Sequence, residues 1–228
     1  MLTADQPWQI IALLGSLVLL RLAVGWAVRE PNGRARVVEF VDAALIATLL
    51  VFCLIRPLVA QAYCIPSASM VPTLREGDRV LVLKAAYWFG LPQHGDIVVF
   101  RHPDEAVAGK VDLIKRVIGT GGDLLQLDDR GLRRNNRLIP EPYTAEHMSE
   151  VWPVGAYPLR VPQGHVLLLG DNRDESQDSR RWTKELTSEV VVDAPFVPCE
   201  DIRGRACAVF WPPTRCHVLR RPAPAAEP

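Results

Sequence analysis

Residues 111–119 read VDLIKRVIG, a short run in which apolar and β-branched residues enclose two adjacent basic ones. Such a run, closed by a glycine, is typical of a β-strand. Neighbouring side chains of a strand point to opposite faces of the sheet, so one of Lys115 and Arg116 can be buried while the other is solvated. The lysine then has two candidate roles, as a buried functional amine or as an edge-strand charge that discourages aggregation.

Five further runs of this kind lie on either side of it in the sequence. They are DRVLVLKAAYW, GDIVVFRH, GDLLQL, GHVLLLGD and RACAVFW, with Gly, Pro, Asn and Asp between them. Turn signals recur often enough to predict an all-β or mostly β domain. The polar stretch 130–162 is expected to form hairpins and loops, and residues 184–191 are expected to form a short helix.

Apolar residues make up 49% of the 228-residue chain, but they are concentrated in the first 65 residues. This uneven distribution predicts a membrane anchor followed by a soluble domain. The formal net charge is zero, so electrostatics gives no reason to expect nucleic acid as a partner. A chain of this length allows one or two compact domains.

Two apolar segments of the expected anchor, residues 1–62, each approach the ~20 residues that a membrane-spanning helix needs. We predict transmembrane helices over about 8–28 and 39–60. Arg21 interrupts the first, where a central arginine costs about 2.5–3.5 kcal/mol, although its side chain can reach the headgroup layer. A cleaved signal peptide is not favoured, because MLTADQPW has no basic residue. A hydrophobic hairpin inside a soluble protein is the remaining alternative.

The loop between the two spans, residues 29–36, reads REPNGRAR and carries three arginines and a Pro-Asn-Gly turn. Positively charged loops stay in the cytoplasm. The β-rich domain, residues 63–219, is therefore expected on the periplasmic or outer side of a bacterial inner membrane that the chain crosses twice. The last residues, 220–228, read RRPAPAAEP and are predicted to be disordered.

Signals for metal binding and redox chemistry are weak. The cysteines form no CxxC pair and no zinc-type spacing with histidine, so neither a metal nor another cofactor is expected. The five cysteines are Cys53, Cys64, Cys199, Cys207 and Cys216. A disulfide among the last three stays open, since it depends on an oxidising compartment.

Two serines lie just after the second span, in residues 65–74, IPSASMVPTL. Ser67 and Ser69 have a proline on either side, and in an extended chain their side chains would share one face. The chain has no GxSxG, HExxH, Walker or SxxK motif, and its five histidines are scattered through loops and strand ends. No spacing points to a Ser-His-Asp triad, so a serine nucleophile here would need another base.

A lysine can be that base if its pKa falls from ~10.4 to about 7–8, which burial among apolar atoms can cause. The chain has only four lysines, and Lys115 is the one with strand hydrophobes on both sides; the others are Lys84, Lys110 and Lys184. Residues 170–180, GDNRDESQDSR, follow a strand and are dense in short polar groups. They form either a solvated turn or a polar cluster that orients the amine.

Taken in order, the motifs IPSASMVPTL, GDRVLVLKAAYW, HGDIVVF, DLIKRVIG and GDNRDESQDSR resemble those of type I signal peptidases over residues 39–211. The resemblance implies a mainly β, antiparallel catalytic domain, of a fold shared with self-cleaving repressors, behind two N-terminal transmembrane helices. It implies a membrane-bound serine endopeptidase that removes signal peptides from exported preproteins, cleaving after small, A-x-A-like residues. Signal peptides, the lipid bilayer and the export translocon would be its partners.

The resemblance also assigns catalytic roles. Ser69 matches the nucleophile and Lys115 the general base of a Ser/Lys dyad. The Ser67 hydroxyl and the Ser69 backbone N–H match the oxyanion hole, and Ser176 matches a serine that hydrogen-bonds the lysine.

Supporting roles follow from the same motifs. Asp178 and Arg180 match a structural ion pair, with Arg116 nearby. The residues that match the walls of shallow apolar substrate pockets are Tyr63, Ile65, Met70 and Ile114.

The chain departs from the family pattern in three places. Residues 119–123, GTGGD, lack the usual proline of this turn, and RNNR at 134–137 replaces an Asn-Gly hairpin, which asparagine tolerates. Residues 182–198 are a longer connection with no assigned role. A repressor-type self-cleaving protease, a peptidase specialised for one secreted substrate and a non-enzymatic peptide-binding domain are the alternatives.

Overall fold

The computed structural model describes residues 15–23, 31–51, 58–104, 109–128, 131–144, 158–180, 182 and 195–222. The chain divides into two compact units, one comprising Ala4–Gln61 and the other mainly Ala62–Pro228. This division lies next to the boundary that the sequence predicts between an anchor and a β-rich domain.

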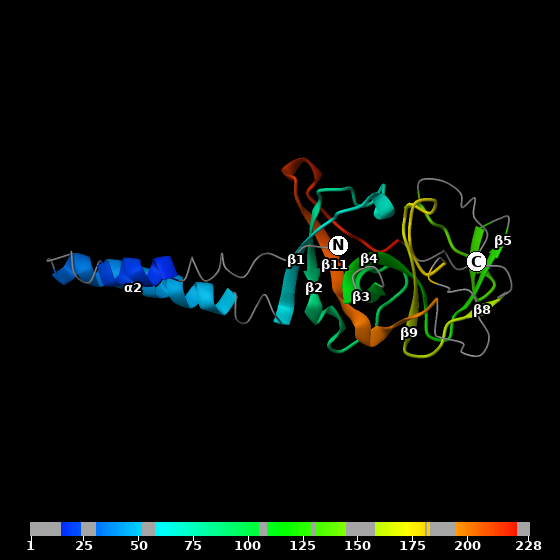
Figure 1. Ribbon diagram of the computed structural model, residues 1–228, viewed down its shortest axis with the longest axis horizontal. Coiled ribbons are helices and arrows are strands. Elements are labelled where there is room, and N and C mark those ends of the chain that lie inside the picture. Colours follow the sequence, from blue (N-terminus) through cyan, green and yellow to red (C-terminus); the bar gives the residue numbers. More distant parts are fainter. Residues whose placement is uncertain are drawn as a thin grey trace. The chain divides into compact units, whose positions relative to one another are not determined.

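Two helical segments lie in the N-terminal unit, residues 15–23 and α2 (Pro31–Leu50) (Figure 1). An ion pair between Arg21 and Asp42 joins them. None of the helices in these described ranges is long and apolar enough to cross a bilayer.

The structure describes only part of the segments for which the sequence predicts transmembrane helices. The transmembrane helices expected over 8–28 and 39–60 extend into residues outside the described ranges and stay predictions. The expected Pro-Asn-Gly turn is wrong, because residues 31–33 form the first turn of α2. Proline suits this position, since a backbone N–H in the first helical turn has no helical acceptor.

The larger sheet of the second unit has the strand order β1-β2-β11-β3-β4-β9-β10, and β12 pairs with β11 (Figure 1). Its strands are β1 (Ala60–Cys64), β2 (Arg79–Leu83), β3 (Ile97–Asp104), β4 (Gly109–Thr120), β9 (His165–Leu169), β10 (Val197–Pro198), β11 (Ile202–Trp211) and β12 (His217–Val218). Every pair whose register is described is antiparallel. The mainly β, antiparallel fold is confirmed.

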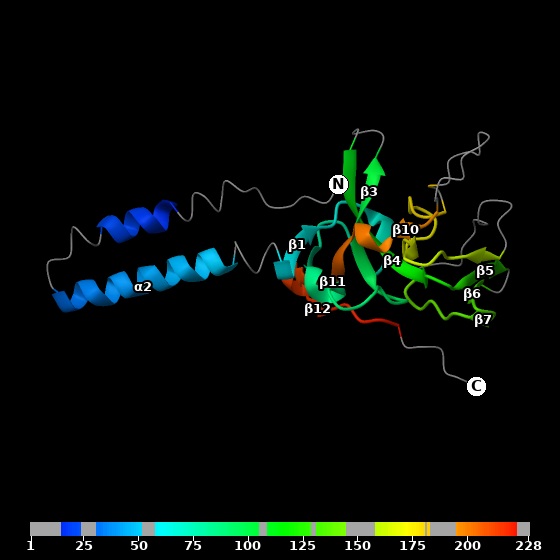
Figure 2. The ribbon, with the colours of Figure 1, turned by 90° about the horizontal axis from the view of Figure 1, so that it is seen from below.

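A smaller antiparallel sheet lies at the end of this unit away from β1 (Figures 1 and 2). Its order is β7-β6-β5-β8, formed by β5 (Leu124–Asp128), β6 (Gly131–Arg134), β7 (Arg137–Leu138) and β8 (Leu159–Arg160). Asn135 and Asn136 turn the β6–β7 hairpin at φ 53° and 66°, a conformation that asparagine adopts more readily than most residues.

Each of the six runs predicted as strands forms one, namely β2, β3, β4, β5, β9 and β11. Short 3₁₀ helices connect several of them: η2 (Ala68–Met70), η3 (Lys84–Tyr87), η4 (Cys199–Asp201) and η5 (Pro213–Arg215). The helix expected over 184–191 lies outside the described residues.

Both faces of the larger sheet are covered. Val98 and Val99 are fully buried in separate apolar clusters, because alternate side chains of β3 point to opposite faces. The adjacent basic residues of β4, Lys115 and Arg116, are thus buried on opposite faces of the sheet. The sequence allowed one of Lys115 and Arg116 to be buried and the other solvated; in the structure both are buried, at 4% and 2% exposed.

The cysteines of the described ranges are free thiols: Cys64, Cys199, Cys207 and Cys216. Cys207 donates a hydrogen bond to the Leu81 carbonyl oxygen at 3.3 Å. Cys53 lies outside the described residues. The disulfide that the sequence left open among the last three cysteines is not formed.

The prediction that the chain is disordered from residue 220 onward places the start of the tail too early. Arg221 forms an ion pair with the buried Asp96, 2.6 Å between Nε and Oδ1. Leu219 packs against an apolar cluster of the core. The chain is therefore part of the fold at least through Arg221.

β11 passes close to the start of η3 at Gly204. A Cβ added there would lie 2.5 Å from the Leu83 carbonyl oxygen, a backbone atom that cannot move away cheaply. We expect Gly204→Ala to lower the free energy of unfolding by about 1–3 kcal/mol. Chemical denaturation of the full chain in detergent measures this, with Gly90→Ala as the matched control because nothing lies within 4 Å of a Cβ at Gly90. Equal stability of the two variants would contradict the close approach.

Candidate active site

Ser69 lies in the 3₁₀ helix η2, shortly after β1. Ser67 precedes this helix in an extended conformation, at φ −147° and ψ 159°. The Ser67 Oγ lies 3.4 Å from the Ser69 Oγ. Their spacing predicted that the two serines share one face of an extended chain. The structure differs, because the turn into the helix brings them together instead.

Asn172 holds this turn from another part of the chain. Its backbone N–H donates to the Ser69 carbonyl oxygen at 3.2 Å, and its Nδ2 donates to the Ala68 carbonyl oxygen at 3.2 Å. Glu175 accepts a further hydrogen bond from Nδ2 at 3.1 Å. Sequence reasoning assigned no specific role to Asn172, and its only signal was its place in the polar stretch 170–180.

Lys115, on β4, directs its amine at the serine-bearing helix. Its Nζ lies 2.7 Å from the Ser69 Oγ, although 46 positions separate the two residues. Both side chains are buried, with Lys115 4% and Ser69 9% exposed. The fold therefore brings an amine and a hydroxyl into hydrogen-bond contact away from bulk water.

Burial lowers the pKa of Lys115 from 10.5 to about 8, because the charged amine is deprived of water. Asp178 and Asp171 act in the opposite direction, since their negative charges favour the protonated amine, but burial has the larger effect. A substantial fraction of the amine is thus neutral near pH 8. A neutral amine can accept a proton from a hydroxyl group.

Arg116 is held by a buried carboxylate. Its Nε and Nη2 donate to the two oxygens of Asp171 at 2.7 and 2.6 Å, and Nη1 donates to the Gly95 carbonyl oxygen at 3.0 Å. Thr73 donates to Asp171 at 2.5 Å, and the Tyr143 ring centre lies 4.0 Å from the guanidinium carbon. The structure thus gives Arg116 its own acidic partner, Asp171, which the sequence did not single out.

Asp178 and Arg180 form a second buried pair. Arg180 Nε and Nη2 donate to the two carboxylate oxygens at 2.9 and 3.0 Å. Asp178 also accepts the Gly170 N–H at 3.0 Å, and Arg180 donates to the Arg173 carbonyl oxygen at 2.5 Å. Hydrogen bonds between its own residues therefore hold the segment 170–180 together, and it is not a solvated turn. Within the described ranges, no group of three or more acidic, histidine or cysteine side chains could hold a metal ion.

Ser176 is completely buried beside Gly170. A Cβ on Gly170 would lie 2.5 Å from both the Ser176 Cβ and the Ser69 carbonyl oxygen, so only glycine fits there. The Ser176 Oγ has no hydrogen-bond partner among the described residues. The structure places Ser176 next to the backbone of Ser69, without the hydrogen bond to the lysine that the resemblance implies.

The residues matched to substrate pockets gather in one apolar cluster: Tyr63, Ile65, Met70 and Ile114. All four are buried, and the Tyr63 hydroxyl donates to Asp112 at 3.3 Å. Met70 belongs to the serine-bearing helix, and Ile114 directly precedes the lysine. The cluster thus contains the residue that follows Ser69 in the sequence and the residue that precedes Lys115.

Comparison with known proteins identifies the family. The model of the family described as signal peptidase, peptidase S26, matches residues 37–211, which include Ser69, Lys115 and the residues that hydrogen-bond around them. The chain belongs to this family. It is 35% identical to the signal peptidase I of Mycobacterium tuberculosis, over 84% of this chain and 78% of that protein. The signal peptidase I of Leptolyngbya laminosa is 38% identical over 74% and 77%, and that of Bacillus licheniformis 35% over 77% and 96%.

Membership of the signal peptidase family makes this chain a hydrolase that removes signal peptides. The resemblance seen in the motifs is confirmed. The non-enzymatic peptide-binding domain and the repressor-type protease are set aside, because the matched relatives are signal peptidases over most of their own length.

The lowered pKa of Lys115 predicts a pH-dependent cost of folding. The charged amine is disfavoured in the folded chain below pH 8, and this cost disappears as the pH rises from about 8 to 10.5, where the unfolded amine also loses its proton. We expect the stability advantage of Lys115→Met over the wild type to shrink by about 3 kcal/mol across that interval. Denaturation curves of both chains at pH 8 and above 10 measure it. A constant difference would show that the amine is not desolvated.

Proposed function

We propose that this signal peptidase cleaves its substrates by a Ser/Lys dyad, with Ser69 as nucleophile and Lys115 as general base. The observation that carries the proposal is the 2.7 Å contact between two buried groups, the Lys115 Nζ and the Ser69 Oγ. A buried amine whose pKa lies near the working pH can do what a histidine does in other serine peptidases.

The reaction would proceed in two acyl-transfer steps. The neutral Lys115 Nζ takes the proton of Ser69 as the Oγ attacks the carbonyl carbon of the scissile peptide bond. The protonated amine then gives this proton to the leaving nitrogen, and the mature protein departs, with the signal peptide held as an ester on Ser69. Water, deprotonated by Lys115, attacks the ester carbonyl carbon. The bond to the Ser69 Oγ breaks, the protonated amine returns its proton to that oxygen, and the signal peptide is released.

The negative charge on the attacked carbonyl oxygen needs donors. The Ser67 hydroxyl lies 3.4 Å from the Ser69 Oγ, and in the proposal it forms the oxyanion hole with the Ser69 backbone N–H. Each such donor is typically worth about 2.7–4 kcal/mol to the transition state. Asn172 supports this role because it fixes the carbonyl groups on either side of that N–H.

The residues of segment 170–180 would support the lysine. Asp178 and Arg180 close the segment, and Arg116 with Asp171 anchors its start, so buried ion pairs hold the wall beside Lys115 at both ends. Ser176 has an unpartnered, buried hydroxyl in this wall. We assign it the hydrogen bond to the Lys115 amine when that amine releases Ser69 during the reaction.

The substrate would bind as an added strand. β1 is the terminal strand in the order of the larger sheet, and the serine-bearing helix follows it closely. A peptide paired with a sheet edge presents alternate side chains to one wall. In the proposal this wall is the apolar cluster of Tyr63, Ile65, Met70 and Ile114; these side chains are already buried, so little room is left and only small substrate side chains would fit, as in an A-x-A site.

The membrane would bring enzyme and substrate together. The predicted anchor, residues 1–62, shares a surface with the apolar part of a signal peptide, which raises their effective concentration. In this proposal the three arginines of residues 29–36 stay in the cytoplasm, which places residues 63–219 on the periplasmic side of a bacterial inner membrane. In this proposal the lipid bilayer and the export translocon are its partners.

Removing either member of the dyad should abolish cleavage. We expect Ser69→Ala and Lys115→Ala to lower kcat/KM on a preprotein with an A-x-A site by at least about 10³-fold, since each removes the nucleophile or its base. The full chain in detergent is assayed by gel. Lys84→Ala is the matched control and should stay within about threefold of wild type. Substantial cleavage by either dyad variant, shown to be folded by its thermal unfolding, would reject the mechanism.

The dyad also predicts the shape of the pH profile. Because burial lowers the pKa of Lys115 to about 8, the neutral base is scarce below that pH and abundant above it. The wild-type kcat/KM should rise about tenfold per pH unit below pH 8 and level off above it. A flat profile between pH 6 and 9 would count against a lysine base.

A further inference from the structure

The C-terminal strap, residues 219–222, lies against the turn that precedes β3. The Leu219 N–H donates to the Cys207 carbonyl oxygen at 2.8 Å. Gly95 in the turn has φ +84°, and a Cβ there would lie 2.6 Å from the Pro222 Cδ, so this proline packs directly on the glycine. The strap lies beyond residues 37–211, which the family model matches.

Arg221 attaches the strap to Asp96, the next residue of the turn. Its Nε and Nη2 donate to the two carboxylate oxygens at 2.6 and 3.1 Å, a paired geometry that is among the stronger charged hydrogen bonds. Asp96 is 1% exposed and also accepts hydrogen bonds from the Tyr87 hydroxyl and the Gln93 N–H, both at 3.0 Å. Arg205 lies 3.8 Å from the same carboxylate.

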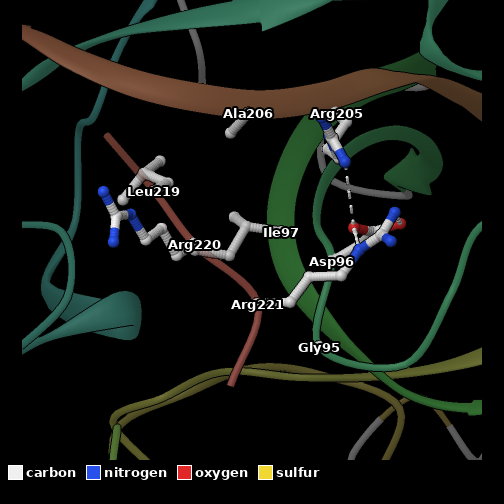
Figure 3. A pocket seen from close by; sticks show the side chains of 8 residues that line it. All are labelled: Gly95, Asp96, Ile97, Arg205, Ala206, Leu219, Arg220 and Arg221. Atoms are coloured by element: carbon white, nitrogen blue, oxygen red, sulfur yellow. Dashed lines mark hydrogen bonds and ion pairs between the residues drawn. The ribbon is translucent and has the colours of Figure 1, made fainter. Parts of the chain in front are cut away.

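Apolar packing alone does not hold the strap in place. A hollow of about 260 Å³ lies beneath it, lined by Ile97, Ala206 and Leu219 together with arginines (Figure 3). Figure 3 shows Arg205 and Arg221 pointing at Asp96, whereas Arg220 points away from it. The ion pair of Arg221 is therefore a main attachment of the strap to the turn.

The turn is in direct contact with the strand that carries the lysine. The Gly95 N–H donates to the Val117 carbonyl oxygen at 2.9 Å, and the Val117 N–H donates to the Asp96 carbonyl oxygen at 2.8 Å. The Gly95 carbonyl oxygen accepts the Arg116 Nη1 at 3.0 Å. The turn thus fixes both the backbone and a side chain immediately after Lys115.

Arg116 connects the turn to segment 170–180. It binds Asp171 through two hydrogen bonds, and the next residue, Asn172, holds the carbonyl oxygens of Ala68 and Ser69. A continuous set of contacts therefore runs from Arg221 through the turn and Arg116 to the nucleophile.

We propose that Arg221 is a positioning residue for the Ser69–Lys115 dyad: its ion pair with Asp96 fixes the turn that holds Arg116, and so keeps the wall beside the lysine closed to water. The proposal rests on the proposed function, since it concerns the same dyad.

The charged groups around the lysine decide the direction of the effect. Asp171 and Asp178 face it from segment 170–180, paired with Arg116 and Arg180, and Ser69 faces it from η2. If Arg116 loosens, water reaches the amine and the charge of Asp171 is less well balanced. Both changes favour the protonated amine, so the pKa of Lys115 should rise toward its ordinary value.

The test is the pH profile of Arg221→Ala in the full chain in detergent, with an A-x-A preprotein as substrate. We expect the midpoint of the rising limb of kcat/KM to move up by about one pH unit. Activity should then be about tenfold below wild type at pH 7 and within about twofold of it at pH 10. Arg220→Ala removes the same charge one position away and should keep the wild-type midpoint.

A purely structural role would give a different result. Loss of folded protein lowers activity by the same factor at every pH and leaves the midpoint unchanged, and that outcome, or an unchanged profile, overturns the proposal. If Arg221→Ala does not fold, Arg221→Lys replaces it, because lysine keeps the charge but not the paired hydrogen bonds. Arg221→Lys should move the midpoint of the pH profile upward by less than is expected of Arg221→Ala. An unchanged midpoint would again contradict the proposal.

The dyad is tested separately. If Lys115→Ala retains activity, the dyad itself fails, whatever Arg221 does. If Lys115→Ala is inactive and the Arg221 variants keep the wild-type midpoint, only the role of Arg221 fails.

Discussion

The buried contact between the Lys115 amine and the Ser69 hydroxyl is the constraint around which the second unit is arranged. A charged amine in an apolar interior is costly, so the lysine can be buried only if its pKa falls or a partner is supplied. Here burial lowers the pKa to about 8 despite two carboxylates that act against it. The same desolvation that weakens folding is what would make the amine a base.

The surroundings of the lysine show how that cost is limited. Asp171 and Asp178, the two carboxylates that favour the charged amine, are each bound by a buried arginine, Arg116 and Arg180. Breaking such a pair would leave an uncompensated buried charge, which is far more costly than the pair is favourable. Segment 170–180 is therefore a rigid wall, and its glycine at position 170 allows that wall to approach the Ser69 backbone.

The strap formed by residues 219–222 adds a further ion pair to these contacts, from beyond the residues that the family model matches. The family model ends at residue 211, yet the ion pair of Arg221 with Asp96 lies only a few contacts from the lysine. In the role proposed for Arg221, a part of the chain outside the shared motifs acts on the catalytic contact, because Gly95 and Asp96 touch both the strap and β4.

The sequence by itself determined six of the strands, β2, β3, β4, β5, β9 and β11, because their apolar runs and turn residues are local signals. It determined the paired asparagines of the β6–β7 turn for the same reason. It also singled out Lys115, since few lysines lie among strand hydrophobes. Only the tertiary structure decided that Arg116 is buried, because a residue's exposure depends on what covers each face of its sheet. It alone paired Arg116 with Asp171 and Arg221 with Asp96, 55 and 125 positions apart. Charged residues leave no periodic pattern in a sequence, so the choice among many oppositely charged partners is made by the fold that brings two of them within reach.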